Sequence, residues 1–440
     1  MRMYDLIEKK RNGGILQEPE IRWMIREYVA GSIPEYQMSA MLMAIYFQGM
    51  TDPETFVLTD AVARSGDMVD LSPIDGIKVD KHSTGGVGDK TTLIIAPVVA
   101  ACGVKVAKMS GRGLGFTGGT VDKLESIPGF NSEMTMQDFF DTVNRTGISV
   151  IGQSANLTPA DKKLYALRDV TATVDSIPLI AASIMGKKLA AGNDAILLDV
   201  TTGSGAFMKE TEKAIELALK MNAIGEAAGK KMVSLITDMD VPLGYSIGNT
   251  IEILEALDVL EGRGPEDLIA VCTALASNML YLAGLGTPAE CSFLVKKAIS
   301  SGAAKNKFRE MVAGQGGDVR YLDDPSLFRQ DTPYQEVTAY ADGYIVKMNA
   351  EGCGIASSLL GAGRITKESV IDPDAGILLK KKTGDAVQKG DVIATLYSSD
   401  PKLFENAKNR FLESITIGAK KPQERPLILA RIEKGQIQYF

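Results

Sequence analysis

The sequence predicts an α/β protein with an all-helical lobe, a larger lobe built on a mixed, mainly parallel sheet, and a C-terminal β-rich α+β domain. Residues 2–66 carry apolar residues at helical spacing between glycine and proline breaks, and from residue 77 short β-branched runs alternate with helical segments. Beyond about residue 335, short strands and tight turns follow one another. At 440 residues the chain can form about two or three domains, each with a core of its own.

The helical lobe is expected to contain four short N-terminal helices. Gly31 ends the second helix and Pro34 opens the third, as glycine and proline do at helix boundaries. The alanine-rich stretch 159–191 also has helical character, and we expect it to return to this lobe and to leave a cleft between two lobes. The helical domain is therefore assigned to residues 1–66 plus 159–193. The N-terminal helices are expected at 2–11, 18–30, 35–48 and 52–65.

The α/β lobe is predicted from five β-branched runs that are separated by helices. Such alternation is typical of a mainly parallel sheet with crossover helices. The α/β domain is assigned to residues 75–155 plus 194–330. Its strands are expected at 77–80, 104–108, 148–152, 195–200 and 232–239, and its later helices at 208–227, 249–260, 264–283 and 289–302.

The C-terminal domain, assigned to residues 335–440, contains two Gly-Asp turns that resemble those of biotinyl or lipoyl carrier modules. The turns lie at 384–385 and 390–391 and bracket the sequence Ala-Val-Gln-Lys. No lysine stands where the modified lysine of a carrier is expected, since Leu396 leads into Tyr-Ser-Ser-Asp. We therefore predict a structural β-rich domain and not a swinging arm.

Composition and charge narrow the classes of function. The net charge of −7 argues against extended nucleic-acid binding, and no apolar run reaches the length of about 18 residues that a membrane span needs. The N-terminus lacks the features of a signal peptide. The four cysteines are widely spaced, which indicates buried reduced thiols. A single histidine excludes a multi-histidine metal site. We therefore expect a cytoplasmic protein with small-molecule ligands.

Two glycine-rich loops predict an anion-binding site. The first contains Lys81, Ser83 and the chain's single histidine, His82, and the second contains Lys108 and Ser110. Each loop follows a strand and precedes a helix, so backbone N–H groups, hydroxyls and lysines converge as a phosphate dianion requires. Solvated lysines on tight turns are the alternative. The region also mimics a dinucleotide fingerprint and an ATPase phosphate loop, but it lacks the acidic residue and the Gly-Lys-Thr order that these motifs require.

Longer motifs carry a resemblance to a known family. From Met1 to the C-terminal domain, the chain resembles the pyrimidine-nucleoside phosphorylase and thymidine phosphorylase family, most clearly in KHSTGGVGD, KMSGRGLG with TGGT and DKLE, LTPADKKLYALRDVTATVDSIPLIAASIM with KK, and DVTTGSGAFMK. The resemblance implies phosphorolysis of uridine, deoxyuridine or thymidine by inorganic phosphate to a free pyrimidine and (deoxy)ribose 1-phosphate. It also implies closure of the cleft around the substrates and a homodimer formed through the helical lobe.

The resemblance further assigns residue roles. His82, Arg168 and Lys187 would be catalytic, because Arg168, Lys187 and a protonated His82 would stabilise negative charge on the departing base while phosphate faces an oxocarbenium-like sugar. Ser183 and Lys187 are four residues apart, so they share one helix face. Phosphate would be held by Lys81, Ser83, Thr92, Lys108, Ser110 and Thr120, and the pyrimidine by Arg168, Ser183 and Lys187.

Three positions depart from the family pattern. Phe116 stands where relatives have histidine, so a polar contact to sugar or base is lost, and Gly186 replaces a serine beside Lys187. Lys90 stands where threonine is usual near a bound potassium ion, and its ammonium would repel a cation or substitute for it in an ion pair with Glu255. No cofactor is expected to be required, and Lys90 argues against potassium. The residues matched to a monovalent-cation site are Gly88, Leu243, Ser246 and Glu255.

Two other functions stay open at this point. An anthranilate-type phosphoribosyltransferase has a similar fold, but it needs carboxylates for magnesium, for which Asp122 and Glu125 are the obvious candidates. A nucleotide-sensing or carrier module is suggested by the C-terminal Gly-Asp turns. Magnesium independence with release of a free base would favour phosphorolysis, and recovery of intact ligand after incubation with phosphate would favour a sensor.

Overall fold

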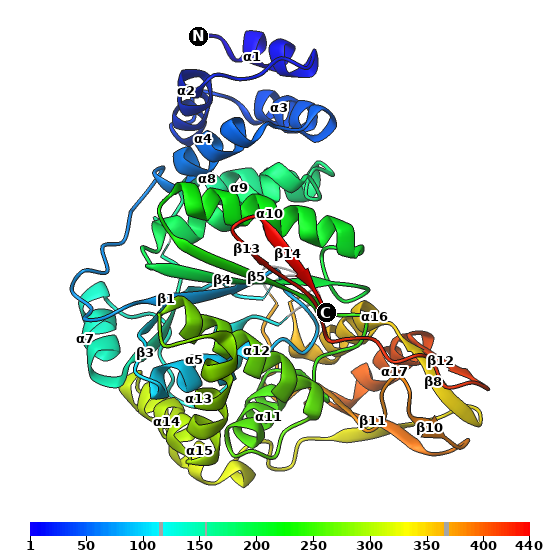
Figure 1. Cartoon of the computed structure of the whole chain (residues 1–440). Coiled ribbons are helices and arrows are strands. Elements are labelled where there is room, and N and C mark those ends of the chain that lie inside the picture. The colour runs from blue at the N-terminus through cyan, green and yellow to red at the C-terminus, as the bar shows by residue number, and fades with distance from the viewer. Residues whose placement is uncertain (114–117, 155, 365–368) are drawn as a thin grey trace.

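The helical lobe lies at one end of the molecule (Figure 1). The computed structural model describes residues 1–113, 118–154, 156–364 and 369–440. Four N-terminal helices pack on α8 (Pro159–Val170) and α9 (Ile177–Ala190) around a core that includes Ile21, Met24 and Leu42. The expected return of the later segment to this lobe is therefore confirmed. The N-terminal helices are α1 (Met3–Arg11), α2 (Glu18–Val29), α3 (Glu35–Gln48) and α4 (Asp52–Ala63).

Local sequence explains how these helices begin and are tied together. Thr51 starts α4 with a capping box, in which its hydroxyl accepts the Glu54 N–H at 3.3 Å and the Glu54 carboxylate accepts the Thr51 N–H at 2.8 Å. The same carboxylate receives the buried ammonium of Lys10 at 2.9 Å, which links α4 to α1. α3 spans the expected residues, and the other three helices differ from expectation by one or two residues at an end.

The α/β lobe is built on a central sheet with the strand order β1-β4-β5-β13-β14. β1 (Val79–Ser83), β4 (Ala195–Thr202) and β5 (Lys231–Asp238) are parallel, and β2 (Val106–Ser110) and β3 (Ile148–Gly152) form a second parallel pair. A parallel bridge just before β1 and β2 joins the two sheets. Each of these five strands overlaps an expected β-branched run, so the mainly parallel sheet is confirmed.

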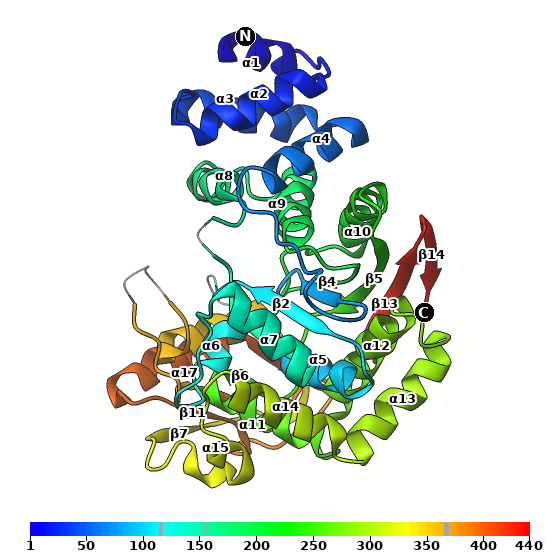
Figure 2. The same cartoon turned by 90° about the vertical axis from the view of Figure 1, so that its left-hand side faces the viewer.

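Helices cover both faces of the central sheet because side chains alternate along each strand. In β4, Ala195 and Leu197 pack into the core formed with α5, α11, α12, α13 and α14, whereas Ile196 and Leu198 pack against α9 and α10. Figure 2 shows α9 and α10 on one side of the strands and α5 and α12 on the other. Since α9 also packs in the helical lobe, it connects the two lobes. The helices of this lobe are α5 (Thr91–Ala101), α6 (Thr120–Leu124), α7 (Met136–Thr146), α10 (Thr211–Ala227), α11 (Thr250–Leu260), α12 (Glu266–Leu282), α13 (Pro288–Ser300), α14 (Ala303–Gly314) and α15 (Arg320–Asp323).

The C-terminal domain combines two small sheets with α16 (Ala350–Ser357) and α17 (Phe404–Glu413). One sheet has the order β10-β8-β12 and the other has the order β6-β9-β11-β7. At the two Gly-Asp turns, Gly384 and Gly390 adopt φ values of 98° and 97°, a conformation that favours glycine. The strands are β7 (Tyr334–Thr338), β8 (Gly343–Met348), β9 (Gly376–Leu379), β10 (Ala386–Val387), β11 (Val392–Tyr397) and β12 (Ile415–Gly418).

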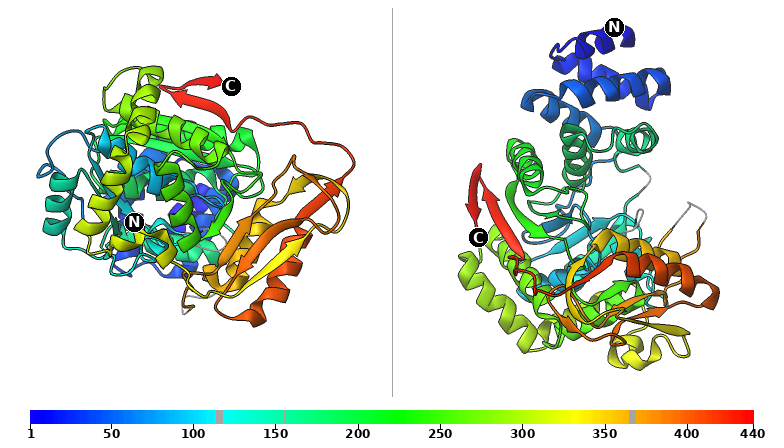
Figure 3. Two further views of the ribbon diagram at one scale, coloured as in Figure 1. Left: turned by 90° about the horizontal axis from the view of Figure 1, so that it is seen from below. Right: turned by 90° about the vertical axis from the view of Figure 1, so that its right-hand side faces the viewer.

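Two segments cross the expected boundary between the α/β lobe and the C-terminal domain. β6 (Ser246–Gly248) pairs with β9 of the C-terminal sheet, and β13 (Ile428–Glu433) pairs antiparallel with β5 and with β14 (Gln436–Tyr439). Figure 3 shows the end of the chain returning from the β-rich domain to the central sheet. The return covers the edge of β5, which would otherwise expose unpaired backbone groups.

No helix within the described residues combines the length and the apolar character needed to cross a membrane.

Candidate active site

A cavity of about 310 Å³ lies where the carboxyl ends of β1 and β2 face α8 and α9. This volume falls within the range of roughly 300–1,000 Å³ that is common for small-molecule sites. Both lobes contribute to its wall, as the sequence predicted. The expected site residues on the wall are His82, Ser83, Thr92, Lys108, Ser110, Thr120, Arg168, Ser183 and Lys187.

The first glycine loop is held close to the cavity by its own hydrogen bonds. The Ser83 hydroxyl accepts the Gly85 N–H at 3.1 Å, and Gly85 has a φ of 98°. The Asp89 carboxylate accepts the Thr91 hydroxyl at 2.6 Å at the start of α5. Thr92 lies in the first turn of α5 and on the cavity wall. The helix N-terminus and the Thr92 hydroxyl thus face the cavity together, which suits an anion.

Lys81 supports this loop from beneath and does not line the cavity. Its Nζ lies 2.9 Å from Asp199 Oδ2 and donates to the Thr91 hydroxyl at 2.6 Å. Because β1 alternates, His82 faces the cavity while Lys81 points to the opposite side of the sheet. The geometry therefore departs from the predicted phosphate-binding role of Lys81. The pKa of Asp199 is raised by burial, and the nearby Lys81 ammonium opposes this shift.

A buried carboxylate that sequence reasoning missed connects the two lobes at the cavity. Asp80 lies between two ammonium groups, with Oδ1 at 3.3 Å from Lys108 Nζ and Oδ2 at 2.7 Å from Lys188 Nζ. Lys108 belongs to β2 and Lys188 to α9, and both line the cavity. Burial lowers the pKa of Lys108 to about 8, with Lys188 and Lys81 adding repulsion and Asp80 opposing them. Charged residues at successive positions of a buried strand were the signal for Asp80 in the sequence.

The imidazole of His82 is neutral at pH 7 in the site without ligand. Burial lowers its pKa well below 6.5, and the positive charges of Lys188, Lys108 and Lys187 lower it further. In the site without ligand, burial and four nearby lysines therefore disfavour the protonated His82 that the resemblance implies. A neutral imidazole donates one hydrogen bond and accepts one.

The helical lobe supplies a cationic wall opposite the loops. Lys187 Nζ donates to Asp161 Oδ2 at 2.9 Å and to the Ser183 hydroxyl at 3.3 Å, so the predicted shared helix face is confirmed. Arg168 is 2 % exposed and donates through Nε to the Thr173 carbonyl and through Nη1 to a carbonyl of α9. Each terminal nitrogen of its guanidinium still carries a second hydrogen that can serve a ligand.

Gly186 has a packing explanation. A Cβ atom at this position would lie 2.9 Å from Val62 Cγ1, so the glycine allows α9 to approach α4 closely. A serine here would require the Val62 side chain or the helix to shift. Phe116, another departure from the family pattern, lies outside the described residues.

The carboxylates considered for magnesium are engaged by arginines. Asp122 Oδ1 accepts Arg364 Nη2 at 2.8 Å, and Asp122 Oδ2 accepts the Gly113 N–H at 2.6 Å. Glu125 Oε1 accepts Arg112 Nη2 at 3.0 Å. Across the part of the chain that the structure describes, no group of three or more His, Cys, Asp or Glu residues is arranged to hold a metal ion.

The four residues matched to a monovalent-cation site do come together. Their common centre is occupied by the ammonium of Lys90, which contacts Leu243, Ser246 and Glu255. Gly88 takes part through its carbonyl, which accepts the backbone N–H of Lys90 at 2.9 Å.

Three family models match the chain in the order of its parts. The helical bundle domain of the glycosyl transferase family matches residues 4–66, and its a/b domain matches residues 75–305. The pyrimidine nucleoside phosphorylase C-terminal domain matches residues 344–418.

Curated relatives are similar over nearly the whole chain. A pyrimidine-nucleoside phosphorylase of Geobacillus stearothermophilus is 54% identical over 433 residues, which is 98% of this chain and 100% of that protein. The pyrimidine-nucleoside phosphorylase of Staphylococcus haemolyticus is 53% identical and that of Bacillus subtilis 54%, over 96% and 92% of this chain and 97% and 94% of theirs.

A solved structure shares the fold. The anthranilate phosphoribosyltransferase of Thermus thermophilus has a TM-score of 0.57 and 20% identity, over 70% of this chain and 98% of that one. This likeness concerns the fold alone. Because the a/b model spans more than half of the sequence and the relatives exceed half identity over nearly all of it, the chain belongs to the pyrimidine-nucleoside phosphorylase family, within the glycosyl transferase family.

Proposed function

We propose that the protein catalyses the phosphorolysis of pyrimidine nucleosides. Uridine, deoxyuridine or thymidine reacts with inorganic phosphate and yields the free pyrimidine and (deoxy)ribose 1-phosphate, with no cofactor. The observation that carries the proposal is a single cavity with a hydroxyl-lined loop end and a cationic helical end. The similarity to curated phosphorylases over nearly the whole chain supports it.

Phosphate binds at the loop end of the cavity. Hydroxyls are supplied there by Ser83, Thr92, Ser110 and Thr120, and the N-terminus of α5 adds its partial positive charge. Lys108 supplies a full charge when it is protonated, and a phosphate dianion favours that state. The same dianion opposes the lysine field around His82 and raises the pKa of the imidazole on binding.

The base binds at the helical end. In the reaction, a phosphate oxygen forms a bond to the anomeric carbon while the bond from that carbon to N1 of the base breaks. The electron pair stays on the pyrimidine, so negative charge develops beside Arg168 and Lys187. Ser183 holds Lys187 in place through their hydrogen bond. His82 donates a hydrogen bond at the edge of the nucleoside.

The phosphoribosyltransferase alternative is less well supported. That reaction needs carboxylates free to hold magnesium on a pyrophosphate. Here Asp122 and Glu125 are paired with Arg364 and Arg112. The C-terminal turns do not support the sensor alternative. Their glycines are explained by the positive φ values that the turns require.

A panel of nucleosides tests the proposal. The protein is incubated with inorganic phosphate and each nucleoside in the presence of a magnesium chelator, and free base and pentose 1-phosphate are measured. We expect release of uracil or thymine without magnesium and no reaction with purine nucleosides. Recovery of every pyrimidine nucleoside intact would contradict phosphorolysis, and a product formed only with magnesium and a phosphoribosyl pyrophosphate would favour the transferase.

The proposal includes a homodimer formed through the helical lobe in the cytoplasm. Tyr36 and Phe47 are 74% and 75% exposed on α3 and lie about three turns apart, so they share a face. Such an apolar aromatic surface is typical of an interface. The four cysteines are free, as is usual in a reducing compartment.

A further inference from the structure

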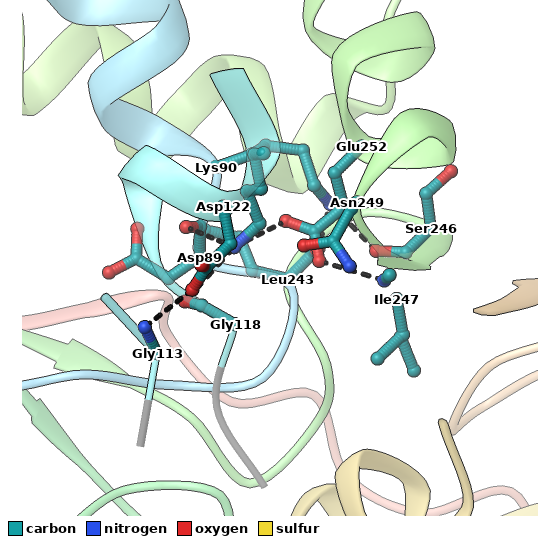
Figure 4. A network of polar contacts seen from close by, with 12 residues as sticks. Asp89, Lys90, Gly113, Gly118, Asp122, Leu243, Ser246, Ile247, Asn249 and Glu252 are labelled. Carbon is teal, nitrogen blue, oxygen red and sulfur yellow. Dashed lines mark hydrogen bonds and ion pairs between the residues drawn. The ribbon is translucent and has the colours of Figure 1, made fainter. Parts of the chain in front are cut away.

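The ammonium of Lys90 is fully enclosed and completely hydrogen-bonded. Its side chain is 0% exposed, and Nζ donates to Glu255 Oε2 at 2.6 Å, to the Leu243 carbonyl at 2.8 Å and to the Ser246 carbonyl at 3.0 Å. An ammonium group has three N–H donors, and each of them has an oxygen here. Figure 4 shows the lysine reaching across to the loop that carries Leu243 and Ser246.

The ammonium itself lies where these oxygens converge, at 2.6 to 3.0 Å from each of them, so a cation cannot occupy the same point. A Cβ atom at Gly88 would lie 2.5 Å from the Leu243 carbonyl oxygen, and one at Gly244 would lie 2.4 Å from Glu255 Oε2. The oxygens that a monovalent cation would use are therefore packed tightly around Nζ. Nζ lies 2.6 Å from the Glu255 carboxylate, so the lysine and the glutamate form a buried ion pair.

A second buried pair balances the charge of the region. Lys123 Nζ lies 3.1 Å from Glu252 Oε2, one turn of α11 before Glu255, and both side chains are almost fully enclosed. Lys123 also donates to the carbonyls of Asp89 and Gly118, so the network in Figure 4 reaches both glycine loops. Two lysines thus neutralise two glutamates. An additional cation among these four side chains would lie close to two ammonium groups, and repulsion between like charges is unfavourable.

We propose that the Lys90 ammonium takes the structural place of a monovalent cation, so that this protein folds and works without potassium. The residues present do not fit a potassium ion together with Lys90. The ammonium, which is part of the protein chain, binds the oxygens that the ion would otherwise bind. This inference concerns the support of the glycine loops and holds for any ligand of the cavity.

The Lys90 ammonium connects three parts of the molecule. Lys90 precedes α5 at the end of the first glycine loop, and Glu255 belongs to α11. Glu255 also accepts the N–H groups of Tyr245 at 2.8 Å and Ser246 at 3.2 Å, and Ser246 begins β6, which pairs with β9 of the C-terminal domain. Loss of the charge therefore loosens both the loop at the cavity and the joint to the C-terminal domain.

Two variants separate the role of charge from that of space. Lys90→Thr removes the charge and opens room for an ion among the same oxygens, whereas Lys90→Met removes the charge but keeps the volume filled. Wild type and both variants are compared in potassium chloride and in tetramethylammonium chloride at equal ionic strength. The melting temperature is measured first, and the rate of phosphorolysis is measured second.

The expected pattern is a potassium response in Lys90→Thr alone. At a potassium concentration of roughly 100 times the site's dissociation constant, the melting temperature of Lys90→Thr rises by about 3 °C, and that of wild type and Lys90→Met changes by less than about 1 °C. The rate follows the same pattern. A specific potassium response in wild type overturns the proposal, as does a Lys90→Thr protein that stays unfolded or unresponsive in both salts. An equal response in Lys90→Met would show an unspecific salt effect and would also overturn it.

Discussion

Replacing Asp80 by asparagine removes the negative charge that lies between two lysines at the cavity. Its oxygens are 3.3 Å from Lys108 Nζ and 2.7 Å from Lys188 Nζ. With Asp80 in place, the pKa of Lys108 is already lowered to about 8. Since an opposite charge at this distance shifts a pKa by about 1–3 units, Asp80→Asn lowers the pKa of Lys108 to roughly 5–7.

Phosphate binding responds first to this change. At about pH 7.5 the protonated fraction of Lys108 falls from about three quarters to about one quarter or less, as follows from a pKa of about 8 in the wild type and of 7 or below in the variant. If the charged form binds phosphate, the KM for phosphate rises by about 3-fold for the smallest shift and by about 200-fold for the largest. Steady-state kinetics with varied phosphate measures this effect. An unchanged KM would refute the reasoning.

Stability responds with a defined dependence on pH. Removing one partner of a buried ion pair costs about 3–5 kcal/mol, and deprotonation of Lys108 relieves part of this loss. The folded-state pKa of Lys108 lies below its ordinary value of 10.5, so its unfavourable charge destabilises the fold at low pH and is relieved as pH rises. In Asp80→Asn, we expect the Lys108 part of the loss to be largest below the variant's pKa and to vanish above about pH 8.

Urea unfolding at about pH 6 and pH 9 checks this dependence, because the loss of unfolding free energy is expected to be larger at the lower pH. A loss that is equal at both pH values would contradict the assigned pKa. The matched control is Asp5→Asn, which breaks the exposed pair between Asp5 and Arg2. It should leave stability and phosphate KM unchanged, since exposed pairs contribute little.

Three further predictions concern the cavity and the helical lobe. In the wild type, the KM for phosphate should rise by about tenfold per pH unit above about pH 8, as Lys108 loses its proton, and a pH profile that stays flat to about pH 10 would contradict this. Lys187→Ala or Arg168→Ala should lower kcat by about 10²–10³ while the circular dichroism spectrum stays native, and wild-type turnover in either variant would refute their role at the base. A protein with both Tyr36→Glu and Phe47→Glu should show half the wild-type mass in light scattering, because charges on this aromatic face oppose association, and an unchanged mass would place the interface elsewhere.

Local sequence signals located most elements of the architecture. Glycine and proline punctuation located the N-terminal helices to within one or two residues, and five β-branched runs located the parallel strands. The resemblance singled out Ser183 and Lys187, and helical spacing predicted that they share one helix face, as their hydrogen bond confirms. The hairpin of β13 and β14 was not predicted as part of the central sheet, because nothing local identifies the strand edge that a distant segment covers.

The sequence by itself determined which residue types gather around the cavity, because strand ends, glycine loops and helix faces are set by local periodicity. Only the tertiary structure decided the charge state and the direction of those residues. Lys81 lies beneath the loop because it pairs with Asp199 on that side of the sheet. The pKa of Lys108 is lowered by burial and by Lys188, which α9 brings to the Asp80 carboxylate. Electrostatic energy depends on distances between residues far apart in the chain and on their burial, and folding alone fixes both.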